Sequence, residues 1–183
     1  TLVDVRKEGN KSVWYNSRFY RSNLYWEKDG FCFRDIHLFD EKMKSEYLDT
    51  PGIGGQFFYY TLPVIDRFYW STPEDKTGLR VVELDKNGNK TGVVLTDPVV
   101  SEPSNSVLKV ESKDKSGNTF IFTFYEDKID VSCKATGKKL DWALELKVPQ
   151  ERIGQLPFKN FGKSSIQSEF RGFDYTITCK KGS

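Results

Sequence analysis

The run Thr119-Phe-Ile-Phe-Thr-Phe-Tyr-Glu-Asp-Lys-Ile-Asp-Val-Ser-Cys133 decides the fold class. Within it, apolar side chains recur at every second position in two segments: Phe120, Phe122, Phe124, then Ile129, Val131 and Cys133. Successive side chains of an extended chain point to opposite faces, so each segment has one apolar face and one polar face. This pattern is typical of antiparallel sheets that bury one face and leave the other in water.

The same alternation extends outward from this run. It predicts strands over Val107–Ser112, Leu140–Val148 and Phe170–Lys180, and Asn87-Gly88 predicts a hairpin between Leu79–Leu84 and Gly92–Thr96. Strands at short intervals with turn residues between them favour a sandwich or barrel. We therefore predict an all-β, largely antiparallel β-sandwich with at most one short helix, formed as a single domain over residues 1–183.

The packing of this sandwich follows from the phase of its strands. We expect one buried cluster that joins the following side chains: Phe120, Phe122, Phe124, Trp142, Leu144 and Leu146.

The N-terminal part predicts strands over Phe19–Trp26 and Phe31–Phe39, with Asp40 as the cap of a short helix. Further strands are predicted over Gln56–Leu62, where Pro63 implies a strand end or an edge strand, and over Val64–Ser71.

Charge and hydropathy exclude several classes of partner. Lys and Arg number 28 against 26 Asp and Glu, which gives a net charge of +2. That balance predicts no nucleic-acid partner. There is no run of about 20 apolar residues, so we predict no membrane span. No signal peptide is visible at Thr1.

The three cysteines, Cys32, Cys133 and Cys179, include no C-x-x-C pair, which argues against a structural zinc site. We expect three reduced thiols. One bridge between Cys133 and Cys179 is the alternative, because both lie in strand-like segments.

The runs Thr119–Cys133 and Leu140-Asp-Trp-Ala-Leu-Glu-Leu146 resemble the galactose mutarotase-like β-sandwiches that accompany glycan-processing enzymes. The resemblance covers about a third of the chain and implies a carbohydrate partner and a secreted or cell-envelope location. Active members are expected to pair histidines with an acid, whereas this chain has one histidine, His37, outside the similar runs. No catalytic residue is therefore transferred from the family.

The candidate catalytic residues are Asp35, His37 and Asp66. Asp35 and His37 are two positions apart and share a strand face, as an acid–base pair requires. Asp35 and Asp66 are a conceivable carboxylate pair for glycoside hydrolysis. Asp35, His37 and Asp40 match a metal-binding triad in ligand type but not in spacing, so we predict no metal and no cofactor.

The candidate ligand-binding residues are Tyr59, Tyr60 and Trp70, within a wider aromatic set that includes Trp14, Tyr15, Trp26 and Tyr69. Sugar faces pack on such rings by burial and dispersion. Trp70 adjoins the polar segment 71–78 and is expected at the surface.

The predicted function is an exported, carbohydrate-associated sandwich domain that binds glycan or supports a glycan-processing enzyme. Two alternatives stay open: a stand-alone glycoside hydrolase or lyase that uses Asp35, His37 and Asp66, and a purely structural or interaction module of a longer protein. An enzyme requires a pocket that gathers His37 and an acid, while a binding module requires exposed rings. The sequence leaves the ligand and the oligomeric state open.

Overall fold

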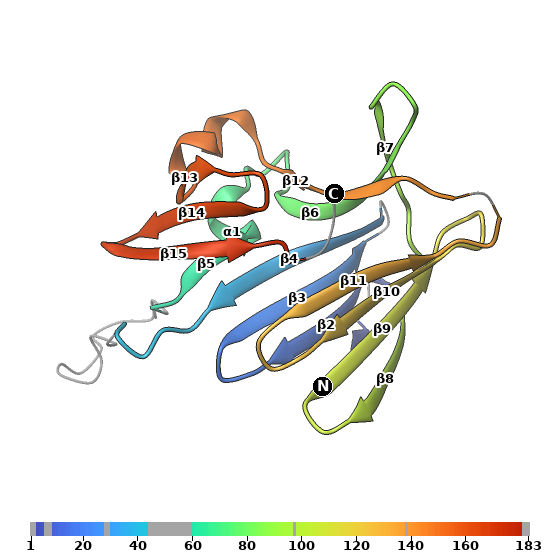
Figure 1. Cartoon of the computed structure of the whole chain (residues 1–183), viewed down its shortest axis with the longest axis horizontal. Coiled ribbons are helices and arrows are strands. Elements are labelled where there is room, and N and C mark those ends of the chain that lie inside the picture. The colour runs from blue at the N-terminus through green and yellow to red at the C-terminus, as the bar shows by residue number, and fades with distance from the viewer. Residues whose placement is uncertain are drawn as a thin grey trace.

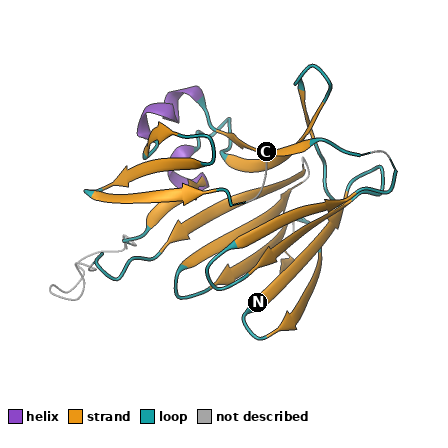
Figure 2. Cartoon of the chain, viewed as in Figure 1, coloured by secondary structure: helices purple, strands orange, loops and turns teal. Residues whose placement is uncertain are grey.

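The computed structural model describes residues 3–5, 9–27, 30–43, 60–96, 98–137 and 139–180. These residues form three antiparallel sheets, which confirms the all-β prediction, and two short helices, one more than expected (Figures 1 and 2).

The large sheet has the strand order β1-β2-β3-β4-β6-β12, with β5 paired to β4 and β7 paired to β6. Its strands are β1 (Val3–Val5), β2 (Lys11–Asn16), β3 (Tyr20–Glu27), β4 (Gly30–Leu38), β5 (Leu62–Asp66), β6 (Gly78–Leu84), β7 (Lys90–Gly92) and β12 (Trp142–Lys147). The covering sheet has the order β11-β10-β9-β8 and consists of β8 (Val99–Ser104), β9 (Val107–Lys113), β10 (Thr119–Phe124) and β11 (Ile129–Lys134). The small sheet consists of β13 (Phe158–Phe161), β14 (Ser165–Phe170) and β15 (Phe173–Thr178).

The main core lies between the large sheet and the covering sheet. Phe122 of β10 is fully buried, and its ring centroid lies 4.7 Å from that of Phe31 and 5.5 Å from that of Phe33. Phe120 and Phe124 flank it on the same face and are also fully buried. The apolar positions whose alternation predicted β10 are therefore the ones that face β4.

The predicted cluster is confirmed for its phenylalanines and holds in part for β12. Trp142, Leu144 and Leu146 pack against the core but stay partly exposed. Trp142 meets Phe120 edge to face at 5.6 Å. Because β12 is the last strand of the large sheet, its side chains are covered from fewer directions than those of β10.

One edge of β4 pairs with β3, and the other edge pairs with β5 and β6, which follow one another along it. Asp35 and Ile36 pair with β5, whereas Phe33 pairs with Leu79 of β6. Between β5 and β6 the chain leaves the sheet for residues 67–77, first as the single helical turn α1 (Arg67–Trp70) and then as a loop. We call residues 67–77 the excursion, and it positions the candidate site.

The excursion corrects one predicted strand. Val64–Ser71 is extended only as far as Asp66, because the Asp66 carboxylate accepts a hydrogen bond from Tyr69 N (2.9 Å) and caps α1. Pro63 lies in β5, which pairs with β4 alone among the described strands, so its edge position is confirmed. Residues 44–59 lie outside the described ranges, and with them most of the expected helix after Asp40 and of the strand Gln56–Leu62.

The C-terminal prediction also needs correction. Phe170–Lys180 is not one strand, since Arg171 (φ 52°) and Gly172 (φ 84°) form the turn between β14 and β15. The second helix, the 3-10 helix η2 (Gln150–Gln155), joins β12 to the small sheet.

Gly78 opens β6 at a point where a side chain would collide with β4. A Cβ atom at this position would lie 2.9 Å from Cys32 Cβ and 3.1 Å from its Sγ. We expect Gly78→Ala to destabilise the fold by about 1–3 kcal/mol, since the two strands must separate to accept the methyl group.

The matched control is Gly92→Ala on β7, where a new Cβ meets nothing within 4 Å. Urea unfolding of both variants checks this prediction. Equal stability of the two variants would show that β4 and β6 are farther apart than the structure places them.

Candidate functional site

The candidate site lies on the face of the large sheet that points away from the covering sheet. Phe31, Phe33 and Ile36 of β4 face the core, so Cys32 and His37 face the other way. A β-bulge interrupts the pairing of β3 with β4. Asn23 pairs with Asp35, but the next residue of β3, Leu24, pairs with Phe33. The extra residue is Arg34, and the bulge places Arg34 and Asp35 side by side on the outer face.

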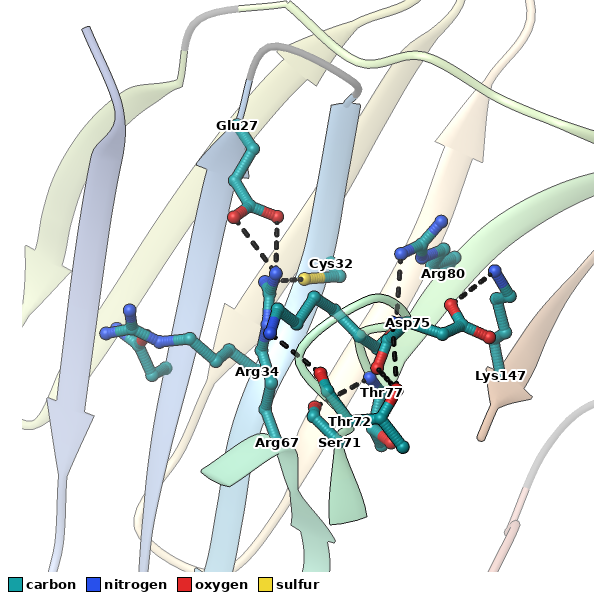
Figure 3. A network of polar contacts seen from close by, with 12 residues as sticks. Glu27, Cys32, Arg34, Arg67, Ser71, Thr72, Asp75, Thr77, Arg80 and Lys147 are labelled. Atoms are coloured by element: carbon teal, nitrogen blue, oxygen red, sulfur yellow. Dashed lines mark hydrogen bonds and ion pairs between the residues drawn. The ribbon is translucent and has the colours of Figure 1, made fainter. Parts of the chain in front are cut away.

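The excursion is tied to this face by an ion pair. Arg67 Nη2 donates to both oxygens of Glu27 at the end of β3, at 2.9 and 2.7 Å. Arg67 Nη1 also lies 3.4 Å from Cys32 Sγ, and the guanidinium passes over the Tyr25 ring at 5.6 Å. Figure 3 shows Arg67 reaching along the sheet from α1 toward Glu27, with Cys32 beside it.

The loop of the excursion is fixed from within and from β12. Thr77 Oγ1 donates to Trp70 O (2.6 Å), and Thr77 N donates to Ser71 Oγ (3.0 Å). Asp75 accepts a hydrogen bond from Lys147 Nζ at 2.8 Å, which lowers the pKa of the Asp75 carboxyl group (Figure 3). The Thr77 bonds thus close the loop on itself, and the Asp75–Lys147 contact holds it to β12.

A cleft of about 550 Å³ remains between the excursion and the sheet. Its lining combines two aromatic side chains, four charged side chains and three loop residues. These are, in that order, Trp14 and Phe68; Arg34, Asp35, Arg67 and Lys76; and Ser71, Thr72 and Pro73. This volume is within the range of small-molecule sites. Phe68 is 85% exposed although it is a large apolar side chain.

The polar groups of the cleft are held in fixed positions. Arg21 Nε and Nη2 bind the two oxygens of Asp35 at 2.9 and 3.1 Å. Arg34 Nε donates to Asn23 Oδ1 at 2.7 Å, and its guanidinium lies 4.1 Å from the Tyr25 ring centroid. Pre-positioned donors and acceptors of this kind are what a polar ligand requires.

The structure brings the three candidate catalytic residues together. Asp35 pairs with Asp66 across β4 and β5, and His37 Nε2 lies 3.7 Å from Asp35 Oδ2 and 3.4 Å from Asp66 Oδ2. His37 Nδ1 shares a hydrogen bond of 2.7 Å with Thr61 Oγ1. His37 and Asp66 are buried, and only Asp35 of the three lines the cleft.

The predicted ligand-binding rings are placed differently. Trp70 is 4% exposed and packs edge to face on Phe158 of the small sheet, so its predicted surface position is wrong. The single turn of α1 rotates Trp70 inward and Phe68 outward. Tyr60 lies under Arg171 at 5.2 Å, and Tyr59 is outside the described residues.

Two rings of the cleft were absent from the predicted ligand-binding set. Trp14 belonged to the wider aromatic set, and its position between the core residues Val13 and Tyr15 of β2 is the signal that assigns it to the outer face. Phe68 becomes visible only once Asp66 is known to cap a helical turn.

A second cleft, of about 880 Å³, borders the first at Trp14. It lies between β2 and the β8–β9 hairpin and contains mostly polar groups such as Asn16, Ser104 and Asn105. Trp14 therefore lines two adjoining hollows.

The cysteines differ in exposure. Cys32 is buried, Cys133 is partly buried in the covering sheet, and Cys179 is exposed after β15. Burial raises the pKa of the Cys32 and Cys133 thiols, which reduces their reactive thiolate fraction.

We expect a thiol reagent at mildly alkaline pH to label Cys179 first, Cys133 more slowly and Cys32 only on unfolding. Thiol counting on the unfolded protein should give three thiols. A count of one would establish the alternative bridge between Cys133 and Cys179.

No protein-family model matches this chain, and no match was found among curated proteins or solved structures. The galactose mutarotase-like resemblance therefore stays a prediction. Neither described helix is long and apolar enough to cross a membrane.

Proposed function

We propose that this protein is an exported, carbohydrate-associated sandwich domain that binds glycan in the cleft between the excursion and the large sheet. The observation that carries the proposal is the composition of that cleft, where the rings of Trp14 and Phe68 accompany fixed polar groups. A sugar offers apolar C–H faces to rings and hydroxyl groups to charged and polar side chains.

The exposure of Phe68 supports a ligand rather than a packing role. A phenylalanine that is 85% exposed contributes little to the fold, because side-chain burial is what stabilises it. Asp35, Ser71 and Thr72 supply hydrogen-bond acceptors and donors at the same cleft. Glycan binding would use the ring and these groups together.

The catalytic alternative has one observation in its favour, which is the convergence of Asp35, His37 and Asp66. Against it, His37 and Asp66 are buried behind Asp35, while a general acid or base must reach the reacting group. Incubation with a bound glycan separates the two functions. New reducing ends or unsaturated products, lost in His37→Gln, would establish a hydrolase or lyase.

Glycan binding is tested by isothermal titration of Trp14→Ala and Phe68→Ala against oligosaccharides that bind the native protein. We expect affinity to fall at least about tenfold in each variant, or roughly 1.4 kcal/mol, because a stacking ring is lost. Phe161→Ala is the matched control, since Phe161 is 72% exposed but lies outside the cleft.

Each variant is first checked for an unchanged melting temperature. Unchanged affinity in Trp14→Ala and Phe68→Ala would contradict the assignment of the site. Absence of binding to any glycan would favour the remaining alternative, a structural or interaction module.

A further inference from the structure

The second cleft is lined mainly by polar groups without a charge. Among its described lining residues only Glu102 is charged. Four others are polar and neutral: Asn16, Ser104, Asn105 and Ser106. An asparagine amide both donates and accepts hydrogen bonds, as hydroxyl groups do. Within the part of the chain that the structure describes, the side chains of Asn16 and Asn105 are exposed and make no hydrogen bond, so both amides are accessible to a ligand.

The wall that the β8–β9 hairpin gives to this cleft is anchored to the core. Tyr15 is buried, and its ring stacks on that of Phe124 with the centroids 5.4 Å apart. The Tyr15 hydroxyl group donates to Ser106 O at 2.7 Å. Ser106 has a φ of 64°, in the left-handed region that glycine prefers, and residues held in that region cluster at ligand sites. The Tyr15 hydrogen bond ties this turn to the core, so the hairpin keeps its position beside β2.

The two clefts adjoin at one residue. Trp14 lines the first cleft together with the excursion, and it lines the second together with the β8–β9 hairpin. Each volume, about 550 Å³ and about 880 Å³, is by itself within the range of small-molecule sites. A ligand confined to the first cleft makes no contact with the second, whereas a chain of linked sugar units extends past Trp14 into it.

We propose that the second cleft is a further subsite of the glycan-binding site, so that the ligand is an oligosaccharide whose chain spans both clefts past Trp14. One sugar unit packs on Phe68 and Trp14, and the units that follow form hydrogen bonds with the amides of Asn16 and Asn105. This inference rests on the proposed glycan-binding function and adds the length of the ligand. Because linked units make the second contact intramolecular, affinity increases with chain length until both clefts are filled.

Calorimetric titration with oligosaccharides of increasing length tests this inference. The probes are linear oligomers of glucose, of mannose and of galactose, each from the disaccharide upward. In at least one series we expect the affinity to rise about tenfold or more between the shortest oligomer that binds and the length at which the affinity levels off. The long oligomers should bind as one molecule per protein chain, because one ligand fills both clefts.

Two variants locate the second subsite. Asn16 and Asn105 are exposed and neither has a positive φ, so the melting temperatures of Asn16→Ala and Asn105→Ala should not change. Each variant should lose most of the affinity gained with chain length, while its affinity for the shortest oligomer stays the same. Phe68→Ala should instead weaken the binding of short and long oligomers by the same factor, because Phe68 lines only the first cleft.

Asn87→Ala is the matched control. Asn87 is an exposed asparagine on the β6–β7 turn and lies outside both linings, so its replacement should change neither the affinity for short oligomers nor the gain with length.

The outcomes separate this inference from the proposed function. Equal affinity for the short and the long oligomers of every series that binds overturns the second subsite and leaves glycan binding in the first cleft intact. A gain with length that persists in Asn16→Ala and Asn105→Ala also overturns it, because the longer chains then bind elsewhere. Absence of binding to every oligomer overturns both the inference and the proposed function.

Discussion

Phe122→Ala should cost about 3–5 kcal/mol of unfolding free energy, the largest loss we expect from a single substitution. Phe122 is fully buried in β10 and packs between the rings of Phe31 and Phe33 of β4. Truncation removes these contacts and leaves a cavity in the centre of the core, where β-sheet backbones on both sides limit collapse.

Trp142→Ala is the informative comparison. Trp142 is the larger side chain, but it is partly exposed on β12, so we expect its loss to cost less than that of Phe122. Urea unfolding of both variants measures which substitution lowers the free energy of unfolding more. A greater cost for Trp142→Ala would mean that the core is centred on β12 rather than on the contact between β4 and β10.

Glu27→Ala should cost about 2–4 kcal/mol, because it leaves the Arg67 guanidinium without its carboxylate partner. The Arg67 side chain is only 11% exposed and lies against Cys32 and the Tyr25 ring. An unpaired charge in that position is poorly solvated. Since Arg67 begins α1, glycan affinity should fall together with stability.

Chemical denaturation of two matched variants checks the cause of this loss. Glu145→Ala removes the partner of Lys90 at a site where both side chains are more exposed (38% and 54%), and it should cost no more than about 1 kcal/mol. Glu27→Ala combined with Arg67→Met removes both charges and should recover part of the stability. Equal costs for Glu27→Ala and Glu145→Ala would show that the excursion is not held by the ion pair.

The covering sheet could be predicted because its strands obey one local rule. Phe120, Phe122 and Phe124 alternate without a break, so the phase fixes which face is buried. The excursion could not be predicted in this way. The carboxylate of Asp66 captures Tyr69 N, the chain turns by one helical turn, and a count of alternate residues then assigns Trp70 to the wrong side.

The candidate site was predictable only where its strand is regular. Asp35 and His37 were expected on one face, and they share it because β4 pairs with β3 without a register shift between them. Arg34 lies on the same face only because of the β-bulge, which places one extra residue in β4. The amino-acid sequence gives no sign of this bulge.

The proposal that sugar binds against Trp14 is tested most directly by the four indole N–H signals in a ¹H–¹⁵N spectrum recorded with and without a bound glycan. Trp26 donates to Ser112 in the core, and Trp70 packs on Phe158, so both should keep their chemical shifts and serve as internal controls. Our account predicts that the Trp14 signal moves in proportion to occupancy while those of Trp26, Trp70 and Trp142 stay in place. An unmoved Trp14 signal under saturating glycan would contradict it.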